Sequence, residues 1–429
     1  MYKKHPIVNK ALNKIYENIP DNCICIRNKI YNINNFEHPG GNTFIQINKG
    51  CDITTLFETH HISIEKAEKL LKTLEKDYVG DYYSTFNYDF TLYRKLRSKV
   101  NLIFNTKKKR NTNFIHKSYL IFYLLLGIYL HNLLLKQTKF SFNYLLICLA
   151  SSLINSILGG FGHNGLHKLL YSSLLLDWNG LSSIEWLLEH VHSHHMYTNT
   201  ENDHDSISMR PFLNWIPDKT ASIFGSKGKH LIYLIAEVVV PIQGLFIHKF
   251  RWSILFKNEY PFYLRVAPFL FIFRIYSHLF FQGIIFGSLT VLICLLIAGY
   301  YFAYLAHLNH ASNESNKSNE SNKSNESNER YERYEKTIIN KDYVIYQLEQ
   351  TNDIKIPNYL QHIFLNLDRQ TIHHLFPTID HGHLKKVKKI IKKDLEENLI
   401  IIKSKNICKL NSEINKILDY NKNNVTGNC

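Results

Sequence analysis

Three groups of histidines lie just outside long apolar runs in this sequence. They are His163 and His167, then His190, His194 and His195, and finally His373 and His374. Residues four apart on an α-helix share a face, so the two imidazoles of each His-x-x-x-His pair can reach one metal centre. Imidazole suits iron, zinc and copper. The pattern therefore predicts a metal site assembled from three segments of the chain.

The number of these histidines narrows the metal chemistry. A single pair at this spacing is more often structural, but three groups at apolar boundaries are hard to explain as surface or core packing. A zinc hydrolase needs three or four ligands and a general-base carboxylate, as in an HExxH helix, and the sequence has no such motif. Seven ligands indicate two metals, and nitrogen-rich di-iron sites activate dioxygen.

A second kind of site is indicated by the string His38-Pro-Gly-Gly. Glycines let the backbone turn sharply and let a flat macrocycle come close, so His38 can supply one axial imidazole to a heme iron. The string Phe57-Glu-Thr-His60-His61 offers the opposite ligand, with His61 as the first choice and His60 as the alternative. The competing interpretation is a plain turn that carries an exposed histidine.

The elements that hold these residues divide into a small domain and a long apolar region. Residues 18–83 predict a small soluble α+β domain, and residues 84–117 a linker that contains the basic cluster Lys107–Arg110. Residues 118–400 predict an all-α membrane domain, because a helix needs roughly 20 apolar residues to cross a bilayer. Residues 401–429 form a C-terminal tail. The four expected transmembrane helices cover residues 118–135, 142–158, 260–278 and 283–305.

Three further segments carry predictions of their own. The run 230–247 contains Glu237 and Pro241, which favours an interfacial helix over a further span. The Ser-Asn-Glu and Ser-Asn-Lys repeat at 312–329 is too polar to fold and predicts a disordered insertion. Residues 384–399 place aliphatic side chains on one helical face and lysines on the other, which predicts a helix lying on an anionic membrane leaflet.

Composition indicates the compartment. The formal charge is +15, but 45% of the residues are hydrophobic and lie in long runs, which favours an anionic membrane face over nucleic acid as the partner. The basic cluster beside the first span marks that side as cytosolic. Four crossings then return the chain to the side of the N-terminus, the histidine groups and the C-terminus. Seven scattered cysteines fit a reducing environment, and the N-terminus lacks the apolar core of a cleavable signal peptide.

These strings together resemble a known combination of domains. Residues 20–82, from the His38-Pro-Gly-Gly motif to the closing Tyr78-Val-Gly-Asp, resemble the cytochrome b5 domain fused to desaturases. Residues 118–395 resemble front-end acyl desaturases, whose pattern is HxxxH, then HVxxHHxYTN, then QxxHHLFP. In the cytochrome b5 pattern His61 stands in the ligand place and His60 in the place of a tyrosine. The resemblance implies the heme ligands His38 and His61, and the iron ligands His163, His167, His190, His194, His195, His373 and His374.

The resemblance also ranks the remaining polar residues. Gln370, which replaces the first histidine of the third group, would orient a ligand or a water. The family often carries an Asn-His pair at the position of Asn309 and His310, so His310 is a further candidate ligand and His307 a less favoured one. His192 matches no ligand position and is expected to be a neighbour of the site. The histidines expected on the surface or in packing roles are His362, His381 and His383.

One departure from the family pattern affects the expected substrate fit. Asn366-Leu-Asp-Arg369 stands where front-end desaturases usually have Gly-Leu-Asn-Tyr. We expect Asp368 and Arg369 to change the fit of the substrate near the metals, while the spacing of the histidines is kept.

The resemblance implies an oxygen-dependent front-end fatty acyl desaturase of the endoplasmic reticulum membrane. Such an enzyme uses heme b, two Fe ions and O2, and takes electrons from an NADH-cytochrome b5 reductase. Its substrate is an acyl-lipid or acyl-CoA in contact with membrane lipid, and its new double bond lies between the carboxyl end and an existing one. The rivals are a fatty acyl or sphingolipid hydroxylase, or a sphingolipid desaturase, of the same di-iron class, and a non-catalytic heme or metal membrane protein. Regioselectivity, acyl carrier and oligomeric state stay open.

Overall fold

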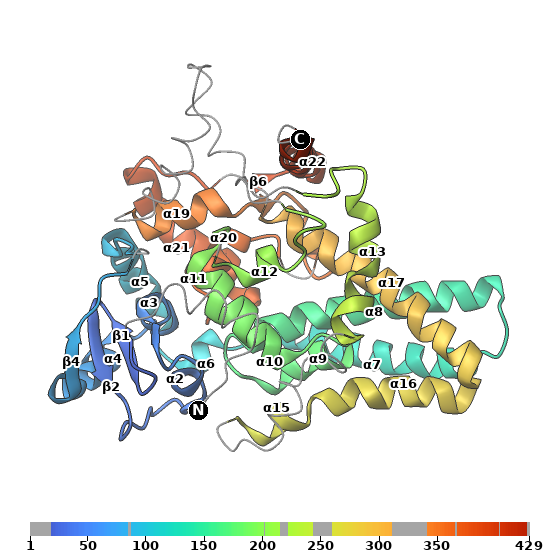
Figure 1. Ribbon diagram of the computed structural model, residues 1–429, viewed down its shortest axis with the longest axis horizontal. Coiled ribbons are helices and arrows are strands. Elements are labelled where there is room, and N and C mark those ends of the chain that lie inside the picture. Colours follow the sequence, from blue (N-terminus) through green and yellow to red (C-terminus); the bar gives the residue numbers. More distant parts are fainter. Residues whose placement is uncertain are drawn as a thin grey trace.

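The computed structural model describes residues 19–84, 87–200, 202–214, 222–242, 260–310, 341–364, 367–402 and 404–426. A small domain with a sheet lies at one side of the molecule, long helices extend from the other side, and short helices fill the region between them (Figure 1). The predicted combination of an α+β domain with a helical membrane domain is confirmed. The predicted insertion at 312–329 lies outside the described residues.

The N-terminal domain is built on a β-hairpin. Strand β1 (Cys23–Ile26) pairs antiparallel with β2 (Lys29–Asn32). Arg27 and Asn28 between them both have positive φ, as a two-residue hairpin turn with the twist of the strands requires. The sheet has the order β3-β1-β2-β4. Its other elements are α2 (Thr43–Ile47), β3 (Cys51–Asp52), α3 (Thr54–His60), α4 (Ile64–Thr73), η1 (Leu74–Asp77) and β4 (Tyr78–Asp81).

The segment predicted to be a linker is largely a packed helix. Helix α5 (Thr91–Phe104) precedes the short α6 (Lys107–Arg110). Tyr93, Leu96 and Val100 recur at helical spacing on α5 and are fully buried, because this face packs against helices α19 and α21 of the C-terminal half. The small domain is therefore followed by a rigid element and not only by a flexible tether.

The helical domain has four candidate membrane spans among the described residues, as the sequence predicts. Asn113 and Ser141 begin the first two helices by accepting hydrogen bonds from backbone amides of the first turn. Gly283 lies between the last two helices and has a φ of 80°, a positive value that glycine adopts without steric cost. The two hairpins turn at the far right of Figure 1, and their other ends meet the short helices. The spans are α7 (Phe114–Leu135), α8 (Phe142–Leu166), α15 with α16 (Phe262–Val266 and Pro268–Gln282) and α17 (Ile284–Leu308).

Short elements form a cap over one end of these helices. Within it, the described part of α13 (Lys229–Ile242) has 14 residues, fewer than a bilayer crossing needs, and it packs along α17. The remaining elements of the cap are η2 (Tyr171–Ser173), α9 (Leu174–Trp178), α10 (Ser183–Trp186), the π-helix η3 (Leu187–His194), α11 (His195–Tyr197), α12 (His204–Ile207), α19 (Tyr343–Gln350), β5 (Asp353–Ile354), η6 (Asn358–Leu360), α20 (Gln370–Leu375), η7 (His381–His383), α21 (Leu384–Glu397), β6 (Ser404–Lys405) and α22 (Ile407–Thr426).

The prediction of a membrane-surface helix at 384–399 is wrong. Helix α21 forms as expected, but Val387, Ile391 and Leu395 are buried against α5. Lys95 and Lys99 of α5 also pair with the buried Asp394 of α21. The periodicity correctly predicts an amphipathic helix, but a protein helix covers its apolar face instead of a lipid surface.

A buried carboxylate joins the N-terminal domain to α5. Glu58 of α3 is completely buried, and its oxygens accept hydrogen bonds from Arg27 at 2.8 Å and from Arg97 at 2.8 Å. Arg94 of α5 is a third partner, at 2.5 Å. Burial opposes ionisation, but the arginines outweigh it and hold the pKa of Glu58 below its ordinary value. The ion cluster therefore fixes α5 against the small domain.

We expect Glu58→Gln to lower the free energy of unfolding of the full chain at pH 7 by about 3 kcal/mol, because it leaves buried Arg97 without its counter-charge. Since the folded pKa is depressed, this stabilisation is complete above the unfolded value of about 4.3 and is lost as the pH falls through the folded pKa. Thermal unfolding in detergent across pH 3–8 measures it. Glu68→Gln is the matched control, because Glu68 also pairs with Arg27 but its side chain is 34% exposed, and its loss should cost at most about 1 kcal/mol. Equal effects of the two variants at pH 7 would contradict the prediction.

Candidate active site

The first histidine group lies where a membrane helix enters the cap. Helix α8 continues beyond the apolar run predicted to end at residue 158, and its last turns carry His163. His167 follows as the residue that ends the helix. Gly165 lies between them, and a Cβ there would lie 2.1 Å from the Ser172 side-chain oxygen. The glycine therefore lets η2 pack closely across this turn.

The second group lies on a π-helix and not on the expected α-helix. His190 and His194 belong to η3, and His195 follows at the start of α11. In a π-helix the hydrogen bond runs from residue i to i+5, so residues five apart are stacked as well as residues four apart. His190 and His195 use this spacing, and their Nε2 atoms lie 3.1 Å apart. The wider turn brings three imidazoles of one segment to the same side.

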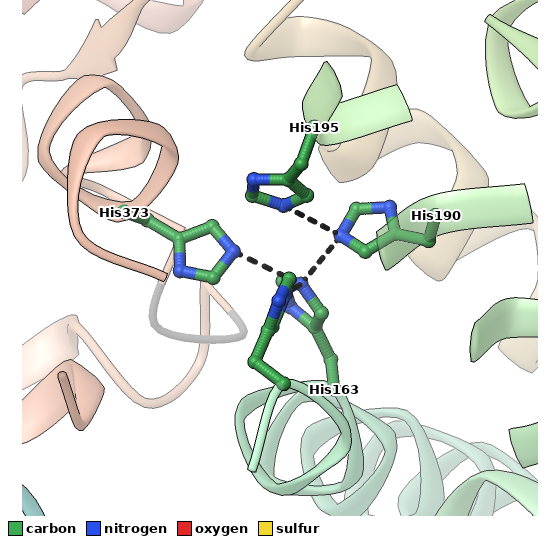
Figure 2. Close-up of side chains that lie close together, drawn as sticks. His163, His190, His195 and His373 are labelled. Carbon is green, nitrogen blue, oxygen red and sulfur yellow. Dashed lines mark hydrogen bonds between the residues drawn. The ribbon is translucent and has the colours of Figure 1, made fainter. Parts of the chain in front are cut away.

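Two more segments complete the cluster. Helix α20 carries His373 and His374, and His310 lies directly after the end of α17. Figure 2 shows His163, His190, His195 and His373 pointing toward one another from three segments. The Nε2 of His163 lies 2.8 Å from that of His190 and 3.2 Å from that of His373.

Two groups consist of buried histidine nitrogens alone, and in each the possible ligand atoms lie within 4.8 Å of one another; a third, overlapping group joins His190 and His194 with Asp205. The first group contains His163, His167, His190, His195 and His373. The second contains His194, His310 and His374. All seven histidines predicted as ligands are thus brought together, and the further candidate His310 joins them.

This arrangement fits metal ions. Ligand nitrogens about 2.1 Å from one metal lie roughly 3 Å from each other, and the Nε2 atoms of His194 and His310 are 3.3 Å apart. The Nε2 of His374 is buried and has no hydrogen-bond partner among the described residues. Burial, followed by the neighbouring imidazoles, holds the pKa of His374 well below its ordinary value. A neutral imidazole keeps the lone pair that a metal needs.

Carboxylates hold two of the imidazoles from behind. The Nδ1 of His194 lies 2.7 Å from Asp203, and the Nδ1 of His190 lies 2.8 Å from Asp205. Burial opposes ionisation of both carboxyls, but the imidazoles outweigh it and hold the pKa of each below its ordinary value. A carboxylate on Nδ1 keeps the proton on that nitrogen and leaves Nε2 for a metal.

Two further side chains contact the Nδ1 atoms of the histidines on α20. Gln347 of α19 lies 3.0 Å from the Nδ1 of His374, and His381 lies 3.2 Å from the Nδ1 of His373. The expectation of a surface or packing role for His381 is wrong in its first part, because the side chain is buried and contacts a predicted ligand. None of these four partners is predicted from the sequence. The acidic pair in Asp203-His-Asp205, close after the second group, was the available signal, whereas Gln347 and His381 have none.

The remaining predicted residues lie around the cluster in different roles. The side-chain nitrogen of Gln370 is 3.1 Å from the Nε2 of His310, so Gln370 does lie at the site. Asn309 is buried, and its amide donates to the Leu305 carbonyl at the helix end. His383 contacts the Asn111 carbonyl, and the ring of His362 lies against Tyr119, as packing roles require. His192 belongs to neither nitrogen group.

A cavity adjoins the nitrogen group that contains His194, His310 and His374. Its polar wall includes His194, His310 and Gln370, and its apolar wall includes Trp186 and Phe302. Trp186 stacks on His190 with ring centres 5.0 Å apart, so the apolar wall directly meets the predicted ligands. His307 also lines this cavity without joining the two histidine groups.

The N-terminal domain brings His38 and His61 together. Their ring centres are 5.9 Å apart, close to the roughly 6 Å expected when two imidazoles bind opposite sides of one metal at about 2 Å. A Cβ at Gly40 would lie 2.9 Å from the His38 ring, so the glycine is needed there. The Nδ1 of His61 contacts the Phe57 carbonyl at 2.9 Å, and burial lowers the pKa of both imidazoles. The pair therefore fits an axially ligated heme. His60 turns toward Phe44 instead.

Two sequence families match the chain. The fatty acid desaturase family matches residues 139–405, and the cytochrome b5-like heme/steroid binding domain matches residues 10–82. The first match spans more than half of the chain and contains all three histidine groups. The second contains the paired imidazoles of His38 and His61.

Curated relatives share both regions. The Delta(5) fatty acid desaturase A of Dictyostelium discoideum is 25% identical, over 89% of this chain and 87% of its own length. The Acyl-lipid (8-3)-desaturase B of the same organism is 24% identical, over 87% and 85%. The Cytochrome b5-related protein of Drosophila melanogaster is 23% identical, over 87% and 82%. No solved structure gives a significant match.

The two histidine groups, the paired imidazoles of the small domain and both family matches agree. The chain belongs to the fatty acid desaturase family and carries an N-terminal cytochrome b5-like domain.

Proposed function

We propose that this protein is a front-end fatty acyl desaturase that uses O2, two irons and the electrons of a heme b in its own N-terminal domain. The observation that carries the proposal is the convergence of eight buried imidazoles from four segments in two adjacent groups. Two curated relatives are named as a Delta(5) and an (8-3) desaturase, which supports action near the carboxyl end of the acyl chain. The glutamine at position 370, which leads the third histidine group, supports the same class over a hydroxylase.

In this proposal each nitrogen group holds one iron. One iron would be held by His163, His167, His190, His195 and His373, and the other by His194, His310 and His374. Bound iron and O2 supply an oxidant strong enough to remove hydrogen from unactivated C–H bonds, which no side chain can do. Each turnover removes two hydrogens from the acyl chain. Together with two electrons and two protons they reduce one O2 to two waters.

The chain's own residues orient the imidazoles. Asp203 accepts hydrogen bonds from the Asn199 amide at 2.7 Å and the Ser206 hydroxyl at 2.6 Å, so its carboxylate is fixed before it meets His194. Gln370 spans from α20 to His310 and ties two segments of the second group. These contacts keep the ligand nitrogens in place while electrons enter and leave.

The acyl chain would lie along the cavity beside the nitrogen group of His194, His310 and His374. Trp186 and Phe302 offer an apolar wall, and His194 and His310 form the polar end of the same space. An apolar wall excludes water from the reacting carbons, so the oxidant meets the acyl chain and not solvent. The substrate is an acyl-lipid or an acyl-CoA drawn from the surrounding membrane lipid.

The heme would be held by His38 and His61 and reduced by an NADH-cytochrome b5 reductase. Because a heme iron carries one electron at a time, two reductions of the heme would serve one turnover. Covalent fusion makes the transfer to the iron centre intramolecular, and a high effective concentration replaces diffusion of a separate carrier. We place the protein in the endoplasmic reticulum membrane as a four-span protein, with its N-terminus, cap and C-terminus in the cytosol.

The proposal is tested by expressing the full chain in a yeast host fed polyunsaturated fatty acids. We expect a new double bond nearer the carboxyl end, and we expect His194→Ala and His374→Ala each to abolish it, because the ligands act as one unit. Iron content is measured beside the product profile. His230→Ala is the matched control, since this exposed histidine contacts Tyr300 and belongs to neither nitrogen group. An alcohol product, or full iron with normal product in both ligand variants, would refute the proposal.

Asp203→Asn should weaken iron binding or activity by roughly 10- to 100-fold while the fold is kept, as is typical of partners behind a metal ligand. The physical reason is that an amide holds the Nδ1 proton of His194 less firmly than a carboxylate. Iron retained during graded chelator dialysis measures the effect. Asp205→Asn, whose carboxylate is one-third exposed, should lose less. Identical retention in the wild type and Asp203→Asn would exclude this role.

The full chain should show the split visible spectrum of a low-spin heme after reduction. His61→Ala should abolish it because an axial position is left open. His60→Ala should retain most of it, since His60 faces Phe44. Difference spectra of purified protein at equal heme-to-protein loading check both outcomes. A spectrum lost in His60→Ala and kept in His61→Ala would reverse the assignment.

A further inference from the structure

His192 of η3 lies against the cytochrome b5-like domain. Its Nδ1 is 2.8 Å from the side-chain nitrogen of Asn48, and its ring centre is 5.0 Å from that of Phe44. Asn48 and Phe44 both belong to the region around α2, and the Asn48 amide also donates to the Phe44 carbonyl at 2.7 Å. An amide nitrogen donates, so His192 accepts at Nδ1. The two domains therefore meet in a hydrogen bond that is buried on both sides.

Phe44 also contacts His60, with ring centres 5.6 Å apart. Three rings thus lie in sequence across the boundary, namely His60, Phe44 and His192. His60 is the chain neighbour of the proposed heme ligand His61. His192 lies between two proposed iron ligands, His190 and His194, two residues from each.

The contact is reinforced by apolar packing on its flank. Ile47 of α2 packs against a cluster of Ile184, Tyr260 and Leu264 in the helical domain. Asn48 and His192 are each less than a tenth exposed. A hydrogen bond inside such a shielded contact fixes one docked arrangement, because breaking it leaves polar atoms buried.

Both histidines are positions where the chain departs from the family pattern that it resembles. His60 stands in the place of a tyrosine. His192 stands inside the HVxxHHxYTN pattern, at a position that is not a ligand. Their Nε2 atoms are buried and have no hydrogen-bond partner among the described residues, so neither side chain has a local role in stabilising its own domain through that atom. Their meeting across Phe44 accounts for two departures that are unrelated in the sequence.

We infer that His60, Phe44 and His192 form the junction through which single electrons pass from the heme domain to the metal centre, with Asn48 holding the junction closed. The inference rests on the proposed function. Each transfer moves one electron from a ferrous heme, which becomes ferric, to an oxidised iron of the centre. Electron tunnelling falls steeply with distance and favours bonded paths and contacts between rings over solvent gaps. On the heme side the junction begins at His60, one residue from the proposed ligand His61. On the iron side it ends at His192, two residues from the proposed ligands His190 and His194.

The test is the rate at which photoreduced heme is reoxidised in the full-length protein under argon, with a soluble flavin as photosensitiser. Reoxidation should be fast with iron bound and slow after iron is removed by chelation. With iron bound, His192→Ala and Phe44→Leu should each slow it tenfold or more, while heme spectrum and iron content stay normal. His230→Ala should leave the rate unchanged, because it removes a histidine outside the junction. Hydrogen exchange over residues 43–50 reports docking independently and should rise in His192→Ala.

The outcomes separate the junction from the function on which it rests. If His192→Ala loses iron, Phe44→Leu decides, because Phe44 lies in the other domain and contacts no proposed iron ligand. Reoxidation within twofold of the wild type in Phe44→Leu, together with unchanged hydrogen exchange in His192→Ala, would overturn the junction while the di-iron function stands. Heme that is never reoxidised in the iron-loaded wild type would overturn the proposed function itself.

Discussion

Eight imidazoles lie in two buried groups in which their possible ligand nitrogens are within 4.8 Å of one another. Burying a polar nitrogen without a partner costs free energy, and imidazoles that face each other at 2.8 to 3.3 Å cannot all act as donor and acceptor in turn. In the proposed function, one cation in each of the two groups would satisfy the lone pairs of that group together. The four segments that carry the imidazoles must therefore end at the same level. Helix α8 extends past its apolar run and brings His163 there, and the π-helix brings His190 and His195 to the same side.

The partners behind the imidazoles make this cluster specific and not merely dense. Asp203 is fully buried, yet it stays ionised because His194, Ser206 and the Asn199 amide all approach it. The carboxylate of Asp203 thus contacts His194, whereas the neutral amide of Gln347 contacts His374. The negative charges of Asp203 and Asp205 also lie close to where two cations would sit, which lowers the cost of placing those cations in a buried site.

The cytochrome b5-like domain is docked through several independent contacts. Glu58 ties it to α5, and α5 is itself packed against α21 of the helical domain. Asn48 and Phe44 meet His192 on the other side of the domain boundary. A tether alone would raise the encounter rate between heme and metal centre. Fixed contacts go further, because they select one orientation of the domain, in which Phe44 lies between His60 of α3 and His192 of η3.

The sequence by itself determined the elements and the chemistry. Apolar runs near bilayer length predicted four spans, the His38-Pro-Gly-Gly motif predicted a heme-type turn, and the spacing of the histidines predicted a shared metal site. These features depend on local periodicity and residue type, which a single chain displays directly. The tertiary structure alone decided which partners stand behind the ligands. Gln347 lies 27 residues before His374, and His381 lies 8 residues after His373. Only packing brings them into contact with these histidines. It likewise decided that α21 covers α5 and not lipid, and that His192 faces Phe44, because an amphipathic or polar face specifies burial but not the surface that covers it.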